Sequence, residues 1–277
     1  MRRIDHLVVA VRDLDSAADF YRRLGFQVGA RNRHPWGTEN RLVQFRSSFI
    51  ELITTGDDPA LIPPHGDGVF SFGAFVRDSL IRREGFPMLV LDSEDATGDA
   101  AAFAAAGIGA FQPFFFERKG VRPDGTPTHV AFTLAFAADP LAPEAGYFVC
   151  QQHFPENFWN PSFQIHANGG ENITAVTLTT PRPQAHAAFL STFGHSTANT
   201  GTDGAVTVPL RGGRIIASST GAGETPRLTG FAVQVPSLSA TAALLQKADI
   251  PFHATADTLT ISPDIAFGTA IVFEGTP

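Results

Sequence analysis

Short apolar runs alternate with alanine-rich amphipathic runs along the whole chain. Each apolar run predicts a buried β-strand, and each run that follows it has apolar residues at helical spacing. The apolar runs cover residues 4–11, 86–91, 173–178 and 228–235. The predicted helices end beside Gly25, Gly107, Gly194 and Asp249. The pattern therefore predicts a repeated unit that begins with a strand and a helix.

Two or three further apolar runs follow each predicted helix, which gives a unit of strand, helix and three strands. Such a unit of roughly 55 residues cannot bury both faces of its sheet alone, and stacked or paired repeats are the usual solution. Four units fit into 277 residues if the first two carry longer insertions. We therefore expect an α+β fold built from a fourfold internal repeat.

The insertions suggest where the units begin and end. The segment 55–85 is rich in proline and glycine and is expected to join the first two units, with room for a short helix. A second connector covers residues 155–172. We predict a first pair of units in residues 1–160, and a second pair in residues 161–277. The units themselves are expected at 1–55, 86–154, 171–221 and 226–277.

Composition and charge narrow the range of partners. Hydrophobic residues make up 43% of the chain, which allows one or two large cores. The formal net charge of -7 argues against binding to nucleic acid or to an anionic membrane. The single cysteine, Cys150, cannot form an internal disulfide, and Met1 leads directly into a strand rather than into a signal peptide. We expect a cytoplasmic protein with a small-molecule partner, as a monomer or a homodimer.

The first unit carries two residues with metal-binding chemistry. His6 lies on its first strand and Glu51 on its last, and imidazole nitrogen and carboxylate oxygen are both ligands of divalent metals. A lone strand histidine is more often simply buried and hydrogen-bonded. A buried glutamate needs a partner, and Arg41 is an alternative to a metal in that role.

The same residues belong to a familiar pattern. The segment Ile4–Asp15, followed by Phe20-Tyr21-x-x-Leu24-Gly25-Phe26, resembles the opening of the vicinal oxygen chelate superfamily. That superfamily includes glyoxalase I, extradiol dioxygenases and bleomycin-resistance proteins. The segments 34–42 and 150–161 are similar, more narrowly, to its glyoxalase-like domain proteins.

The resemblance implies βαβββ modules that pair into two cup-shaped, barrel-like, half-closed sheets. It also implies that the first and last strands of paired modules each direct a metal ligand into the cup. His6 and Glu51 match these two positions, whereas Met88 stands where the second module would place its histidine. His153 is our choice of third ligand, followed by Gln151, because alternation puts both on one face of their strand.

Other residues complete the predicted site. Glu51 is expected to act as a base as well as a ligand, and His34 is a second catalytic candidate in a loop at the mouth of the cup. Candidate substrate contacts are Trp36, Asn40, Gln151 and Trp159. Packing of the 155–172 connector is an equally simple role for Trp159. The 25 phenylalanines would favour an apolar or aromatic ligand if they line the cup.

Two functions follow from this set of residues. The first is a metal-dependent lyase, isomerase or dioxygenase that uses zinc, nickel, manganese or iron and no nucleotide cofactor, and acts on a small oxygen-chelating substrate. The second is a metal-free protein that binds or sequesters a small molecule, because three of the four modules lack the ligands. Metal content and oxygen uptake would separate the two.

Overall fold

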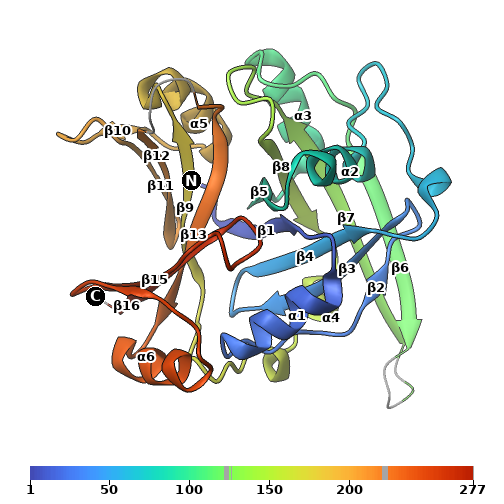
Figure 1. The fold of residues 1–277 in the computed structure, drawn as a ribbon. Coiled ribbons are helices and arrows are strands. Elements are labelled where there is room, and N and C mark those ends of the chain that lie inside the picture. The colour runs from blue at the N-terminus through green and yellow to red at the C-terminus, as the bar shows by residue number, and fades with distance from the viewer. Residues whose placement is uncertain (122–124, 126, 220–223, 277) are drawn as a thin grey trace.

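The computed structural model describes residues 1–121, 125, 127–219 and 224–276. Its strands form two mixed sheets of eight strands each (Figure 1). The first sheet has the order β2-β3-β4-β1-β5-β8-β7-β6, and the second has the corresponding order β10-β11-β12-β9-β13-β16-β15-β14. Each sheet therefore joins two βαβββ modules through their first strands. The predicted α+β architecture of four paired modules is confirmed.

The first sheet contains the two modules with the longest connections. Module 1 consists of β1 (Ile4–Ala10), α1 (Leu14–Arg23), β2 (Asn32–Arg33), β3 (Thr38–Gln44) and β4 (Phe49–Thr55). Module 2 consists of β5 (Gly85–Asp92), α3 (Ala96–Ala105), β6 (Phe114–Val121), β7 (Pro127–Ala137) and β8 (Gly146–Gln152). Between them lie the 3-10 turn Pro59–Leu61 and the helix α2 (Phe72–Arg82), which is longer than the connector sequence suggested.

The second sheet repeats this plan. Module 3 consists of β9 (Ile173–Thr180), a 3-10 turn (Pro183–His186), α5 (Ala187–Gly194), β10 (Asn199–Thr200), β11 (Val206–Leu210) and β12 (Gly213–Ser219). Module 4 consists of β13 (Arg227–Val235), α6 (Leu238–Lys247), β14 (His253–Ala254), β15 (Thr258–Ile261) and β16 (Ala270–Gly275). The short helix α4 (Pro155–Phe158) and the turn Pro161–Phe163 lie on the chain that connects the two sheets.

Local signals in the sequence explain where the first helix begins and ends. The carboxylate of Asp13 accepts hydrogen bonds from the backbone N–H groups of Asp15 and Ser16, which caps the start of α1. Gly25 ends the helix with φ of 90°, a conformation that glycine adopts at little cost. This places α1 against the sheet, with Tyr21 fully buried.

Strand β1 is buried on both faces and separates two packed regions. Leu7 and Val9 belong to the large core that runs through both halves of the molecule. Val8 and Ala10 point to the opposite side, into a second apolar cluster inside the first cup. A strand with both faces covered reads as a continuous apolar run, which is what the sequence shows.

Helix α2 fills one end of the first cup. Phe72, Val76 and Leu80 are spaced by four residues, so they form one stripe of the helix, and all three belong to the cluster inside the cup. Met88 on β5 is fully buried in the same cluster. The connector between modules 1 and 2 therefore packs its helix into the cup.

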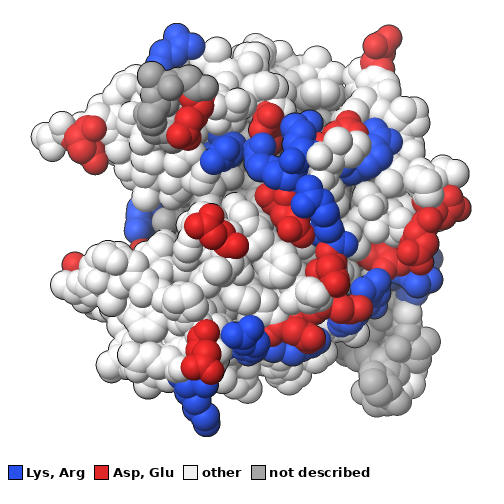
Figure 2. All heavy atoms as spheres, in the orientation of Figure 1, with Lys and Arg blue, Asp and Glu red and all other residues white. Residues whose placement is uncertain are grey.

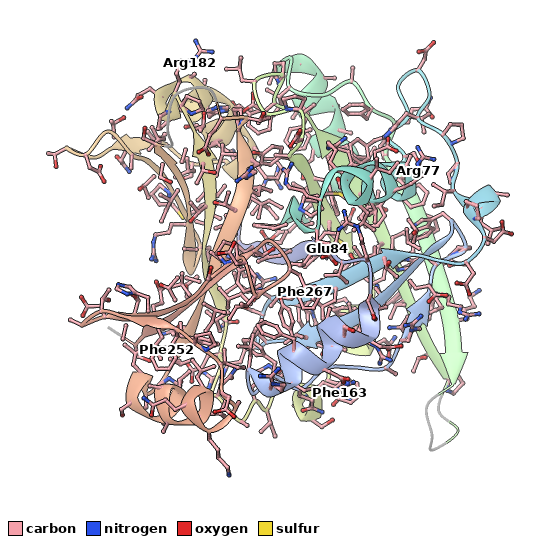
Figure 3. The ribbon with its side chains drawn as sticks, in the orientation of Figure 1. Arg77, Glu84, Phe163, Arg182, Phe252 and Phe267 are labelled. Carbon is pink, nitrogen blue, oxygen red and sulfur yellow. The ribbon has the colours of Figure 1, made fainter. Side chains whose placement is uncertain are left out.

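The two sheets pack through their outer faces and through the helices that cover them. The rings of Phe20 and Phe267 lie 5.8 Å apart across this junction, and Phe267 is labelled there in Figure 3. Phe103 of α3 likewise meets Phe193 of α5 at 6.2 Å. On the face shown in Figure 2, basic and acidic side chains are interspersed. Among the described residues, no helix is long and apolar enough to span a membrane.

Candidate functional site

The first cup contains a cavity of about 460 Å³. This volume lies within the usual range for small-molecule sites. Apolar residues form most of its lining, and seven of them are aromatic, namely Trp36, Phe49, Phe72, Phe116, Phe132, Phe148 and Phe158. The polar residues of the inner wall are His6, His34, Asn40 and Glu51. Asn32, Arg33, Glu117 and Arg118 also border the cavity.

Glu51 is held in place by its neighbour on β3. Asn40 Nδ2 donates to Glu51 Oε1 at 2.5 Å, while Asn40 Oδ1 accepts from Asn32 Nδ2 at 3.1 Å. These two bonds fix the amide orientation of Asn40. Glu51 is only 6% exposed, and its Oε2 makes no hydrogen bond to any described residue. One carboxylate oxygen is therefore anchored and the other is left for the cavity.

His34 stands beside this carboxylate. Its Nδ1 lies 2.8 Å from Thr38 Oγ1, its Nε2 lies 3.8 Å from Glu51 Oε1, and its ring stacks on Trp36 at 4.5 Å. Burial lowers the pKa of His34, an effect that the Glu51 carboxylate opposes and the Arg118 guanidinium reinforces. His34 is therefore favoured as a neutral ring, and its Nε2 accepts a hydrogen bond from Asn40 Nδ2 at 3.3 Å.

His6 has a carboxylate partner that the sequence analysis did not single out. Its Nδ1 lies 2.6 Å from Asp5 Oδ1, and Asp5 Oδ2 accepts a hydrogen bond from Gln152 Nε2. The ring stacks on Phe49 at 4.3 Å. The signal in the sequence was an aspartate within an otherwise apolar strand, since a buried carboxylate requires a partner.

Strand alternation in β8 decides which predicted contacts reach the cavity. Phe148 and Cys150 face it, so Gln151 and His153 lie on the other side of the strand. Gln151 is hydrogen-bonded to the start of α3, because its Oε1 accepts from the backbone N–H of Ala96. His153 is exposed, and its Nε2 lies 2.7 Å from Thr133 Oγ1. The structure does not bring either residue together with His6 and Glu51.

Trp159, the remaining predicted contact, also lies outside the cavity lining. It packs against Phe49 at 5.9 Å and against Phe158 at 5.0 Å, and Phe158 is the residue that reaches the cavity. The other predicted residues, all from module 1, line the cavity together: Trp36, Asn40, His6, His34 and Glu51.

The donor set does not complete a metal site. Within the described part of the chain, no three His, Cys, Asp or Glu side chains are grouped so that they could hold a metal ion. Strand pairing shows what the second module offers at the two matching strand positions: Met88 and Phe148 correspond to His6 and Glu51. A thioether and a phenyl ring do not replace imidazole and carboxylate as ligands of a hard divalent ion.

A comparison with protein-family models assigns the chain. The model of the glyoxalase-like domain matches residues 4–194, which is more than half of the sequence. The chain belongs to the glyoxalase-like domain family. A search of curated proteins gives no significant match. The match covers both modules of the first cup, including every residue of the cavity wall described above.

Solved structures place this glyoxalase-like protein in the vicinal oxygen chelate fold, as the sequence predicted. A hypothetical protein from Staphylococcus aureus has a TM-score of 0.68 at 12% identity, and each chain covers 100% of the other. A triple mutant of 4-hydroxymandelate synthase from Streptomyces coelicolor has a TM-score of 0.63 at 10% identity, with 99% of this chain and 93% of that chain covered.

A catechol 2,3-dioxygenase has a TM-score of 0.56 at 10% identity, with 99% of this chain and 92% of that chain covered. At sequence identities this low, the similarity shows a shared fold and does not assign an activity to this chain.

The thiol of the glyoxalase-like protein lies inside the cavity wall but is not activated. Burial raises the pKa of Cys150, and the nearby carboxylates of Asp5 and Glu51 raise it further. No basic neighbour of this cysteine is evident in the sequence, and none of the described residues lowers the pKa of its thiol. The reactive groups of the cavity are therefore the imidazoles and the carboxylate.

Proposed function

We propose that this protein is an enzyme that binds a small, largely apolar, ring-containing molecule in the first cup and acts on it with acid–base chemistry. One observation carries the proposal: two histidines and a carboxylate line a cavity whose other lining residues are mainly apolar and include seven aromatic rings. Such a cavity binds through its apolar surface and orients its ligand through a few polar groups.

Glu51 is the proposed base. Asn40 holds one of its oxygens, and the other has no partner among the described residues, so it is available to a proton on the ligand. Neutral His34 lies next to the same carboxylate, and both of its ring nitrogens are paired, Nδ1 with Thr38 Oγ1 and Nε2 with Asn40 Nδ2, so it supports the position of Asn40 and Glu51. Phe116 and Phe132 flank this wall and support the exclusion of water from the bound ligand.

A ligand screen tests the proposal. We expect a panel of small aromatic compounds to contain molecules that raise the thermal unfolding midpoint of the wild-type protein and are then chemically converted. Glu51→Gln should keep the shape of the site, retain binding and lose most of the conversion, by about 100-fold or more. Glu171→Gln, which changes a glutamate outside the cavity, is the matched control and should behave as wild type.

Two other results would redirect the assignment. Ligands that bind tightly and are never converted would favour the sequestering protein instead. A metal-dependent lyase or dioxygenase is the second candidate, favoured by the fact that His6 and Glu51 line the same cavity. Elemental analysis of protein purified without chelator or nickel resin, combined with oxygen uptake, would decide it: about one metal equivalent per chain would support it.

A further inference from the structure

Among the residues that the structure describes, two buried aspartate–histidine pairs have the same short contact. In both, histidine Nδ1 lies 2.6 Å from a carboxylate oxygen: His6 with Asp5, and His186 with Asp139. The pairs differ at the other ring nitrogen. Nε2 of His186 lies 2.9 Å from Thr180 Oγ1, so that ring is fully paired. Nε2 of His6 has no hydrogen-bond partner among the described residues, and His6 lines the cavity.

A break in the regular pairing of β1 accounts for the first pair. Neighbouring strand residues normally point to opposite faces, which would keep the side chains of Asp5 and His6 apart. The pairing of β1 with β5 shifts register between Ile4 and His6, as in a β-bulge. Bulges redirect side chains, and this one brings the carboxylate beside the imidazole.

Two further contacts hold the arrangement rigid. Gln152, at the end of β8, donates from Nε2 to the second oxygen of Asp5 at 2.8 Å. Phe49 on β4 stacks on the His6 ring with an interplanar angle of 13°. The carboxylate and the plane of the ring are thus fixed from two other strands of the same sheet, β8 and β4, before any ligand enters.

The chemistry of a carboxylate then determines the tautomer of His6. An ionised carboxylate only accepts hydrogen bonds, so the proton of a neutral His6 ring lies on Nδ1 and the lone pair lies on Nε2. We infer that Asp5 is a positioning residue that holds His6 in this tautomer, so that the first cup selects ligands that place a hydroxyl or N–H group against Nε2.

This inference rests on the proposed ligand site and adds a chemical requirement to it. Glu51 Oε2 is a second hydrogen-bond acceptor in the cavity lining. A ligand that pairs with both acceptors must therefore carry hydrogen-bond donors. A ligand that lacks a donor would leave a desolvated acceptor unpaired, which should weaken binding by about tenfold or more.

Nitrogen-15 NMR of the imidazole rings tests the tautomer without any ligand. At a pH where both rings are neutral, we expect His6 to carry its proton on Nδ1 and not on Nε2. In Asp5→Leu, which removes the acceptor at similar size, the proton should move largely to Nε2. The His186 signals in the same spectrum report whether the variant is folded, and they should not change.

Chemical modification gives a second measurement. Diethyl pyrocarbonate attacks an unprotonated, accessible imidazole nitrogen, so His6 should react through Nε2 while His186, which is paired at both nitrogens, should not. Mass spectrometry of the peptides measures both rates in one sample. We expect Asp5→Leu to slow modification of His6 by about fivefold or more, and Asp5→Glu to restore part of the rate.

The outcomes separate the inference from the function on which it rests. A neutral wild-type His6 with its proton on Nε2, or a His6 as unreactive as His186, would overturn the inference even if the cavity binds and converts a ligand. The expected tautomer together with a complete failure of the ligand screen would instead overturn the proposed function.

Discussion

The fully paired histidine at the junction of the two halves allows a quantitative prediction of stability. Asp139 follows β7, in the first half of the chain, and His186 ends the 3-10 turn before α5, in the second half. They are 3% and 1% exposed. We predict that Asp139→Ala strongly destabilises the folded protein, because it removes one member of a buried pair and leaves the other without a partner.

The magnitude follows from what each atom loses. The hydrogen bond between His186 Nδ1 and Asp139 Oδ2 joins a carboxylate to an imidazole, and such bonds contribute about 1.5–3 kcal/mol. The Nδ1–H group would then be buried without an acceptor, and Leu141 would lose the acceptor for its backbone N–H. Together these losses should lower the free energy of unfolding by about 3–5 kcal/mol. Asp139→Asn keeps an acceptor oxygen and should cost about half as much.

Urea unfolding followed by circular dichroism measures these differences. Asp19→Ala is the control, because its ion pair with Arg22 has side chains 72% and 45% exposed and should contribute about 0.5 kcal/mol or less. An Asp139→Ala protein within about 0.5 kcal/mol of wild type, with an unchanged slope, would refute the reasoning. Equal losses for Asp139→Ala and Asp19→Ala would also refute it.

Three further predictions concern other sites. Gly25→Ala should lower the free energy of unfolding by about 1–3 kcal/mol, since φ is 90° and the new Cβ would lie 2.9 Å from Asn168 Cβ; an unchanged thermal midpoint would contradict this. Burial lowers the pKa of His34 below its ordinary 6.5, so the unfolded chain takes up a proton first as pH falls. The free energy of unfolding should therefore decrease below pH 6.5, and it should decrease less in His34→Gln. Parallel pH profiles for the wild type and the variant would contradict this prediction. Cys150 should react with Ellman's reagent only after unfolding, because it is buried and its pKa is raised; rapid reaction of the folded protein would exclude this.

The sequence by itself determined the modules and the half of the molecule that carries the site. Apolar strands followed by amphipathic helices are local patterns, and they repeat closely enough to predict two paired sheets. The same local patterns placed His6 on a first strand and Glu51 on a last strand, and these do line one cavity. Loop residues next to them, His34 and Trp36, were also expected near its mouth.

Only the tertiary structure decided which side of β8 faces the cavity. The sequence puts Gln151 and His153 on one face of the strand and Cys150 on the other. Both faces of a buried strand can be covered, so alternation alone does not say which face lines the cavity. The register shift between Ile4 and His6 was equally invisible, because it depends on how β1 pairs with β5.

The tertiary structure also decided how much of the cup is open. The connector between the first two modules was expected only to join them, yet α2 packs Phe72 and Val76 into the cup. A helix packs against a curved sheet when its apolar stripe can cover an unfilled concave face. No local sequence pattern specifies that such a face exists. Local periodicity therefore determined the elements and their chemistry, whereas the pairing and packing of distant strands decided which side chains meet in the cavity.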